Sequence, residues 1–303
     1  MLPDLQRDVT RARELLEDGE YGRLLEGAIG RLARPVADEY RIRRGLSELA
    51  RARDPSVRAV ERALRCVHED GFLPYERSQL AAVEERRQAL AADETPVEYH
   101  LHGPSDEGLT EEVYEGYRHE VRVSDFPGAK PEYGPLLYAL ARELDPDRVL
   151  ELGTCLGISG AYIAGGFRND NRLLTVEGGE PQVGIARETF AELGVSDHTT
   201  VRHDRFQDVL LEGGESPRFE MAFLDGHHNH EATLEYFEAL YELADPGAVV
   251  VFDDVVGYSE GMDGAWRTIA ADPRVELSVT TERYGIAVLK AGIPEKRDFS
   301  VPV

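Results

Sequence analysis

The eight residues FLDGHHNH, at positions 223–230, place one aspartate and three histidines in a short segment: Asp225, His227, His228 and His230. A neutral imidazole, with an ordinary pKa of about 6.5, is a suitable general base at neutral pH. The pair His228 and His230, spaced H-x-H, could instead bind Zn, Mn or Fe. A polar loop without chemical function is the third interpretation, and the segments around the string must decide between them.

Two further aspartates follow another apolar run, because AVVVFDD ends in Asp253 and Asp254. Asp225 likewise ends the run FEMAFLD. Neighbouring parallel strands deliver their carboxyl ends to one edge of a sheet, so the three carboxylates can converge there. Their mutual repulsion would be costly unless a divalent cation removed it, and an all-oxygen ligand set suits Mg²⁺. The alternative is that Asp253 or Asp254 merely caps the following helix.

A glycine-rich loop, ELGTCLGISG, follows the apolar run RVLEL, with glycines at Gly153, Gly157 and Gly160. Glycine at the first two positions lets the backbone approach a ligand that a Cβ would block. Glu177 ends the next apolar run, where a carboxylate can accept hydrogen bonds from ribose hydroxyls. A nicotinamide dinucleotide site would favour the tighter spacing G-x-G-x-x-G. A plain strand-to-helix turn is the other alternative.

The elements that position these residues alternate in type from about residue 134 onward. We expect strands at 148–153, 172–177, 199–203, 219–225 and 247–254, and helices at 159–167, 181–194, 206–211, 231–243 and 264–272. Residues 275–290 read as two more strands joined by a tight turn. This alternation predicts an α/β fold with a doubly wound, mostly parallel, seven-stranded sheet.

The first part of the chain has a different pattern of apolar residues. Residues 1–95 carry apolar residues at three- and four-residue spacing, which predicts an all-helical N-terminal extension serving as a lid or a dimer surface. Residues 96–133 are rich in Gly and Pro and are predicted to form a connector of loops with one helix at 110–121. The third segment, 134–303, holds all the motifs described above.

The motifs together resemble those of the class I S-adenosylmethionine-dependent methyltransferases. The resemblance is closest to the catechol O-methyltransferase-like and macrocin-type sugar O-methyltransferase groups. RVLELGTCLGISGAYIA is similar to their first motif, LLTVEGGEPQVGIARETFAELGV to their second, and GAKPEYGPLLYALARELDP to the helix before the first strand. The similarity covers roughly residues 120–290 and leaves the N-terminal helices out.

This resemblance implies roles for individual residues. The cofactor S-adenosylmethionine would lie over the loop from Gly153 to Ser159, with its ribose on Glu177 and its adenine bordered by the residues after the third strand; the implied cofactor residues are Glu151, Gly153, Gly157, Ser159, Glu177, Phe206 and Gln207. The implied metal ligands, for Mg²⁺ or another divalent cation, are Asp225, Asp253 and Asp254. The catechol-type pattern has an amide at the position of Asp254.

The resemblance also offers two candidate bases. His228 stands three residues after Asp225, where catechol-type enzymes have a lysine base. His227 stands two residues after Asp225, at the base position of the sugar-methylating group. We favour His228 and expect His230 to be structural or solvated.

Composition narrows the possible partners. The formal net charge is −24, and only three of the 34 basic residues are lysines, which argues against nucleic-acid or anionic-membrane binding. Such an acidic, lysine-poor surface suits a halophile's salty cytoplasm, although a GC-rich genome also favours arginine. Two cysteines, no apolar leader segment and no apolar run of membrane length indicate a cytoplasmic protein.

The sequence therefore predicts an S-adenosylmethionine-dependent, Mg²⁺-assisted O-methyltransferase. Its partner would be a small hydroxylated acceptor, and the chain could form a homodimer. Two alternatives stay open. One is a non-catalytic S-adenosylmethionine-binding protein, and the other is a different enzyme on the same sheet, such as an NAD-dependent oxidoreductase.

Overall fold

The computed structural model describes residues 39, 41–101, 117–126, 128, 131–211, 218–290 and 297–301. Eight strands form the main sheet, in the order β10-β8-β9-β7-β6-β3-β4-β5. Their bounds are β3 Arg148–Leu152, β4 Arg172–Glu177, β5 Thr199–His203, β6 Phe219–Leu224, β7 Ala244–Phe252, β8 Val275–Thr280, β9 Gly285–Leu289 and β10 Arg297–Ser300. The helices are α3 Pro55–His68, α4 Pro74–Ala91, α6 Gly134–Leu144, α7 Ile158–Gly165, α8 Glu180–Glu192, α9 Phe206–Leu211, α10 His230–Leu243 and α11 Glu260–Ala271.

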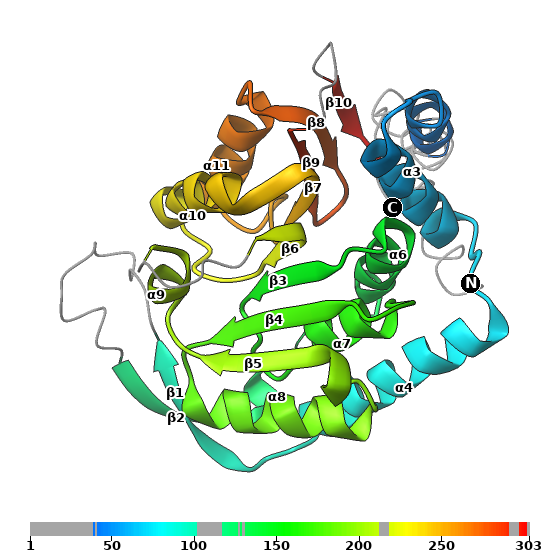
Figure 1. Cartoon of the computed structure of the whole chain (residues 1–303). Helices are drawn as coiled ribbons and strands as arrows, with labels where there is room; N and C mark the ends of the chain where they lie inside the picture. Colours follow the sequence, from blue (N-terminus) through cyan, green and yellow to red (C-terminus); the bar gives the residue numbers. More distant parts are fainter. Residues whose placement is uncertain are drawn as a thin grey trace, which may run out of the picture.

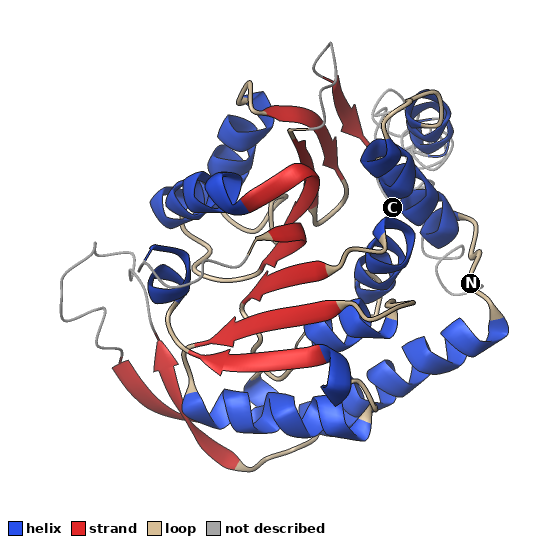
Figure 2. Cartoon of the chain, in the orientation of Figure 1, coloured by secondary structure: helices blue, strands red, loops and turns tan. Residues whose placement is uncertain are grey.

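The central strands β3, β6, β7 and β9 are buried on both faces of the sheet, and helices cover each face (Figures 1 and 2). Successive side chains of a strand point to opposite faces, and the core divides accordingly. On β3, Val149 packs with residues of α6, α7 and α8, whereas Leu150 packs with residues of α9, α10 and α11. Burial on both faces explains why the parallel strands read as nearly continuous apolar runs.

The strand order reverses between β3 and β6. From β3 the chain proceeds outward through β4 and β5, and then returns to add β6 on the other side of β3. In open α/β sheets, ligands bind at this reversal, beyond the carboxyl ends of the strands. Both the glycine loop after β3 and the string DGHHNH after β6 begin at this crevice, so the topology brings the two predicted motifs together.

The predicted α/β class with a doubly wound, mostly parallel sheet is confirmed, with one addition and one correction, whereas the all-helical extension over residues 1–95 stays a prediction. The sheet has an eighth strand, β10, which pairs in parallel with β8. The connector is not all loop: β1 (Pro96–Leu101) and β2 (Tyr117–Arg122) form an antiparallel pair. The helix predicted at 110–121 is therefore wrong over 117–121, and its other residues lie outside the described part of the chain. Tyr117–Arg122 hydrogen-bonds to a strand partner distant in sequence, which local spacing could not reveal.

The described N-terminal helices lie away from the carboxyl edge. In Figure 1 the arrows of β3, β4 and β5 point left, whereas α3 lies on the right. α3 packs on α6, where the Arg62 guanidinium bonds the Glu143 carboxylate, and Arg142 of α6 forms a buried ion pair with Glu76 of α4. A lid over the site formed by residues 1–95 stays a prediction, and α3 and α4 do not provide it.

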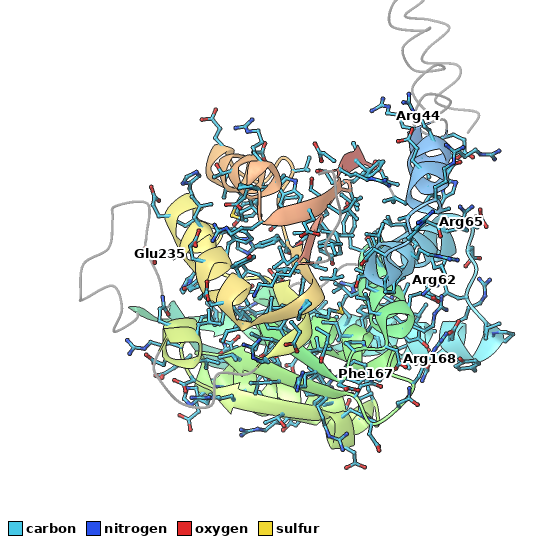
Figure 3. All side chains as sticks on the ribbon, turned by 45° about the horizontal axis from the view of Figure 1, so that its top comes forward. Arg44, Arg62, Arg65, Phe167, Arg168 and Glu235 are labelled. Carbon is cyan, nitrogen blue, oxygen red and sulfur yellow. The ribbon has the colours of Figure 1, made fainter. Side chains whose placement is uncertain are left out.

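The surface of these helices is strongly charged. Arg62 and Arg65 of α3 and Arg44 of the helix at 41–49 are labelled in Figure 3, and each forms an ion pair with a glutamate. Cys66 and Cys155 are both free thiols. In the described part of the chain, no helix is long and apolar enough to cross a membrane.

Candidate active site

The loop after β3 has a backbone that only glycine accommodates easily. Gly153 has φ +108°, and a Cβ added there would lie 1.9 Å from the carbonyl oxygen of Asp225. Gly157, at φ +84°, is the N-cap of α7, and its Cβ would press on Ala186 of α8. The loop is therefore pressed against the end of β6 on one side and against α8 on the other, at the strand reversal where open α/β sheets bind their ligands.

Glu177, at the end of β4, is fastened to this loop. Its Oε2 accepts from the backbone N–H of Cys155 at 2.8 Å, and its Oε1 accepts from the N–H of Gly179 at 2.8 Å. A carboxylate oxygen has two lone pairs, so each can accept a further bond from a ribose hydroxyl. The two backbone bonds set the direction of the carboxylate and join the glycine loop to the turn before α8.

Glu151 and Ser159 lie beneath the loop. Glu151 is fully buried, and its Oε2 accepts from the Thr175 hydroxyl at 2.6 Å. Its Oε1 has no hydrogen-bond partner among the described residues. Burial raises the pKa of Glu151 to about 8, while Ser159 and Thr175 oppose the rise. Both side chains are buried, and their contact with the cofactor stays a prediction.

This buried carboxyl predicts a pH effect on stability. With a folded-state pKa of about 8 against an ordinary 4.5, the folded chain keeps a proton that the unfolded chain has lost. The free energy of unfolding should fall as pH rises between these values and level off above the higher one. Glu151→Gln should gain stability relative to wild type across this window, by a few kcal/mol at about 1.4 kcal/mol per pKa unit.

Urea unfolding of both proteins at about pH 5 and about pH 9 measures the effect. Glu235→Gln makes the same chemical change at an exposed position on α10 (Figure 3) and serves as the control. Equal stability differences at the two pH values for Glu151→Gln would show that this carboxyl is ionised in the folded protein.

The segment after β5 forms an aromatic cluster with α10. Phe206 packs edge-on against His227, with ring centroids 5.3 Å apart, and against Tyr236. Gln207 donates from Nε2 to the Tyr236 hydroxyl at 2.8 Å. His227 has φ +51°, stacks on Tyr236, and has its Nδ1 2.5 Å from that hydroxyl. His227 thus contacts Phe206 directly and is linked to Gln207 through the Tyr236 hydroxyl; both Phe206 and Gln207 are predicted to border the adenine.

His228 faces the opposite way, into the carboxylates. Its Nε2 lies 3.4 Å from Asp225 Oδ1, and its Nδ1 lies 3.7 Å from Asp254 Oδ2. The exposed ring of Tyr258 leans on it at 4.9 Å between centroids. Burial lowers the pKa of His228, but Asp225 and then Asp254 outweigh burial, so the pKa is raised above its ordinary value. Of the two candidate bases, His228 is the one beside the acidic cluster.

The three predicted metal ligands converge, but an arginine lies among them. Arg283, in the turn between β8 and β9, donates from Nε to Asp253 Oδ1 at 2.5 Å and from Nη2 to Oδ2. Its Nη2 also lies 3.1 Å from Asp254 Oδ1. Burial and Asp225 raise the pKa of Asp253, and Arg283 opposes them. A carboxylate whose two oxygens both accept from a guanidinium is in its ionised form.

These carboxylates, as they are arranged, do not fit a divalent ion. Mg²⁺ demands oxygen ligands about 2.0–2.1 Å away in near-octahedral geometry. Both oxygens of Asp253 already accept from Arg283, and the His228 ring stands between Asp225 and Asp254. Among the described residues, no three His, Cys, Asp or Glu side chains are grouped to hold a metal ion.

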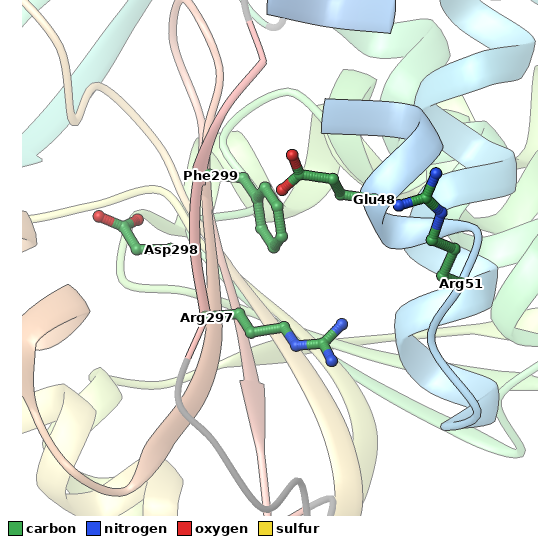
Figure 4. Close-up of a pocket in the computed structure, with 5 residues that line it drawn as sticks. All are labelled: Glu48, Arg51, Arg297, Asp298 and Phe299. Carbon is green, nitrogen blue, oxygen red and sulfur yellow. The ribbon is translucent and has the colours of Figure 1, made fainter. Parts of the chain in front are cut away.

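A separate hollow of about 410 Å³ lies beside β10 (Figure 4). It is lined by Glu48, Arg51, Arg297, Asp298 and Phe299. β10 is an edge strand, separated from β6 by β8, β9 and β7, so this hollow lies away from the strand reversal. It contains none of the predicted site residues.

Comparison with known families now bears on this geometry. Residues 150–255, which run from β3 to the loop after β7, match the family model of a methyltransferase domain. This segment is a class I methyltransferase domain. It holds every residue predicted to bind the cofactor or a metal ion or to act as the base, and the resemblance seen in the sequence is confirmed for it.

Curated relatives are similar over the same part of the chain. Catechol O-methyltransferase of Niastella koreensis is 29% identical over 136 residues, which are 44% of this chain and 60% of that protein. A putative O-methyltransferase of Mycobacterium sp. strain KMS is 29% identical over 163 residues, 53% of this chain and 73% of that protein. Because the match spans 60% of the first relative's length, the activity of the whole chain is a proposal.

Solved structures of methyltransferases are also similar. The O-methyltransferase from Bacillus cereus in complex with SAH gives a TM-score of 0.48 at 27% identity, covering 55% of this chain and 86% of that one. TomG from Streptomyces achromogenes, in complex with SAM, gives a TM-score of 0.46 at 27% identity, covering 54% and 81%.

Sequence reasoning missed two residues that organise the methyltransferase domain. Tyr236 joins Gln207 to His227 but stands at an apolar position of a helix, where it reads as core. Arg283 lies outside the matched segment, in a turn that shares no motif with the aspartates it holds. Only the pairing of β7 with β9 brings that turn to the site.

Proposed function

We propose that this chain is an S-adenosylmethionine-dependent O-methyltransferase that acts on a small hydroxylated molecule. The observation that carries the proposal is that two features meet at one strand reversal. One is the Gly153–Gly157 loop, which would cradle the cofactor, and the other is the imidazole of His228. Gly153 of the cradle contacts the backbone of Asp225, and Asp225 faces the ring of His228. Both reaction partners would therefore meet at the end of β6.

The chain's residues would perform three tasks. The carboxylate of Glu177 would hold the ribose of the cofactor, and the Gly153–Gly157 backbone would lie against the rest of the cofactor. His228 would take the proton of the acceptor hydroxyl as its oxygen attacks the sulfonium methyl. The new O–C bond forms, the S–C bond breaks, and S-adenosylhomocysteine leaves. Positioning the two reactants in line supplies much of the rate.

Two carboxylates flank the imidazole of His228. Its Nε2 lies 3.4 Å from Asp225 Oδ1, and its Nδ1, which has no hydrogen-bond partner among the described residues, lies 3.7 Å from Asp254 Oδ2. After the ring has taken the proton of the acceptor, both carboxylates would stabilise the imidazolium.

Assistance by Mg²⁺, which the sequence also predicts, stays a prediction. The carboxylates predicted to bind the ion are held by Arg283 and separated by His228. If Mg²⁺ were bound here, it would lower the pKa of an acceptor hydroxyl. Loss of turnover in EDTA would be the evidence for it.

Cofactor binding tests the proposal directly. Calorimetry should detect S-adenosylhomocysteine binding and no NAD binding, and a panel of hydroxylated acceptors should then release S-adenosylhomocysteine from S-adenosylmethionine. Preferential NAD binding would favour the oxidoreductase alternative. Cofactor binding with no turnover on any acceptor would favour the non-catalytic one.

Glu177→Gln should weaken S-adenosylhomocysteine binding about tenfold or more, since a charge-assisted bond to the ribose is worth roughly 1.5–3 kcal/mol. The amide NH₂ group of glutamine would also face one of the two backbone N–H groups that now donate to the carboxylate, and that hydrogen bond would be lost. Glu180→Gln, at the exposed first residue of α8, is the matched control and should bind like wild type. Equal affinities for all three proteins would contradict the ribose assignment.

A further inference from the structure

Arg283 is built into the site by its backbone. Its carbonyl oxygen accepts from the N–H of Val255, in the loop that follows Asp253 and Asp254. The Thr281 hydroxyl oxygen accepts from the N–H groups of Arg283 and Tyr284. These bonds tie the turn between β8 and β9 to the end of β7, so the side chain starts beside the carboxylates.

The guanidinium is also held by aromatic packing. It lies over the ring of Tyr133, 5.5 Å from the centroid, at a distance where a cation is attracted to the ring face. Tyr133 packs edge-on against the buried Tyr284, and Tyr284 packs against Phe223 of β6. The guanidinium therefore has a fixed place between an aromatic face and Asp253.

The charge balance of the site calls for such a cation. Asp253 is only 2% exposed, and Asp225 and Asp254 lie around the same His228 ring. A buried carboxylate without a partner is costly, and a divalent ion is one way to remove the cost. A guanidinium is another: it is always charged, and its planar fork matches both oxygens of one carboxylate.

We propose that Arg283 is the resident cation of this site, so that its guanidinium takes the place of a divalent metal ion. Its fork uses both oxygens of Asp253 and its Nη2 reaches Asp254, so the two carboxylates at the end of β7 have no pair of oxygens left for a metal. The inference rests on the proposed function for its catalytic meaning: methyl transfer would proceed without added metal. Arg283 is a positioning residue, because it holds Asp253 and Asp254 around His228.

Metal binding tests this without any turnover. Mn²⁺ is the probe, since it favours the same oxygen ligands as Mg²⁺ and its free ion is counted by electron paramagnetic resonance. The full wild-type chain should leave millimolar Mn²⁺ free, with or without S-adenosylhomocysteine. Arg283→Met should bind one Mn²⁺ per chain, and adding Asp253→Asn to it should abolish that binding. Arg283→Lys, which keeps the charge, should exclude Mn²⁺ like the wild type.

Arg274→Met is the matched control. Arg274 binds the carboxylates of Asp272 and Glu238 in the same multidentate way, but it precedes β8, at the opposite end of that strand from the turn with Arg283. This variant should leave Mn²⁺ free. Arg283→Gln, which retains a donor to Asp253 without the charge, replaces Arg283→Met if the latter does not fold.

Two results would overturn the proposal. One is a wild-type chain that binds Mn²⁺ and loses it on Asp225→Asn. The other is an uncharged Arg283 variant that folds and still binds no Mn²⁺, because the guanidinium would then not be what keeps a metal ion out of the site. Neither depends on the proposed function, which fails separately if the wild type binds no S-adenosylhomocysteine. Once an acceptor is known, EDTA should leave its methylation rate unchanged.

Discussion

His228→Ala is expected to lower turnover by roughly 10²–10⁴-fold, the usual contribution of a general base. The variant loses the nitrogen that faces Asp225, while the glycine loop and Glu177 lie on other strands. S-adenosylhomocysteine affinity should therefore stay near that of the wild type. The rate of S-adenosylhomocysteine release, with the acceptor found in the panel, and calorimetry measure the two effects separately.

His227→Ala is the informative comparison for this prediction. His227 is bound to Tyr236 and packs on Phe206, so its loss should act on cofactor affinity more than on turnover. His198→Ala should change neither, because His198 ends the 3₁₀ helix Ser196–His198 just before β5, at the amino end of that strand. If His227→Ala loses turnover and His228→Ala retains it, the roles that we assign to the two histidines are reversed.

Gly153→Ala is expected to destabilise the fold by a few kcal/mol and to abolish cofactor binding. An alanine at φ +108° is strained by about 1–3 kcal/mol, and its Cβ would lie 1.9 Å from the Asp225 carbonyl oxygen. That oxygen is a backbone atom, and the N–H of Asp225 donates to the carbonyl oxygen of Leu152 at 2.9 Å. The oxygen therefore cannot rotate away as a side chain would. The clash would open the crevice between β3 and β6.

Thermal unfolding and calorimetry of the same samples check this result, and we expect the melting temperature to fall by at least about 5 °C. Gly184→Ala is a control of opposite sign, because a Cβ at that position in α8 meets nothing within 4 Å. Alanine there should stabilise the helix by up to about 1 kcal/mol. A Gly153→Ala protein as stable as Gly184→Ala would mean that the loop and β6 are not in contact.

The packing of Phe206, His227 and Tyr236 explains why two adjacent histidines have different environments. The chain turns sharply at His227, which has a positive φ, so the two imidazoles leave the backbone in different directions. One ring meets Tyr236 and the other meets Asp225. In the sequence both were candidate bases, because spacing from Asp225 alone does not say which way a ring points.

The sequence by itself determined the class of fold and where the site begins on each strand. Strands buried on both faces are mostly apolar, so the runs before Gly153, Glu177, Asp225 and Asp253 could be recognised, and each ended at a glycine or an acidic residue on the carboxyl edge. The glycines of the loop after β3 could also be recognised in the sequence, because no other residue tolerates their φ values with neighbouring atoms so close.

Only the tertiary structure decided what surrounds the aspartates. Arg283 is 30 residues from Asp253 in the chain, and β9 must pair antiparallel with β7 before its turn reaches that carboxylate. The roles of Tyr236 and of the β1–β2 pair could not be recognised from the sequence either. Tyr236 occupies an ordinary apolar position of a helix, and no local sequence pattern connects a strand to a partner distant in the chain. Charge compensation depends on distances in space, so the sequence could predict that the carboxylates need a cation but not that the chain supplies one.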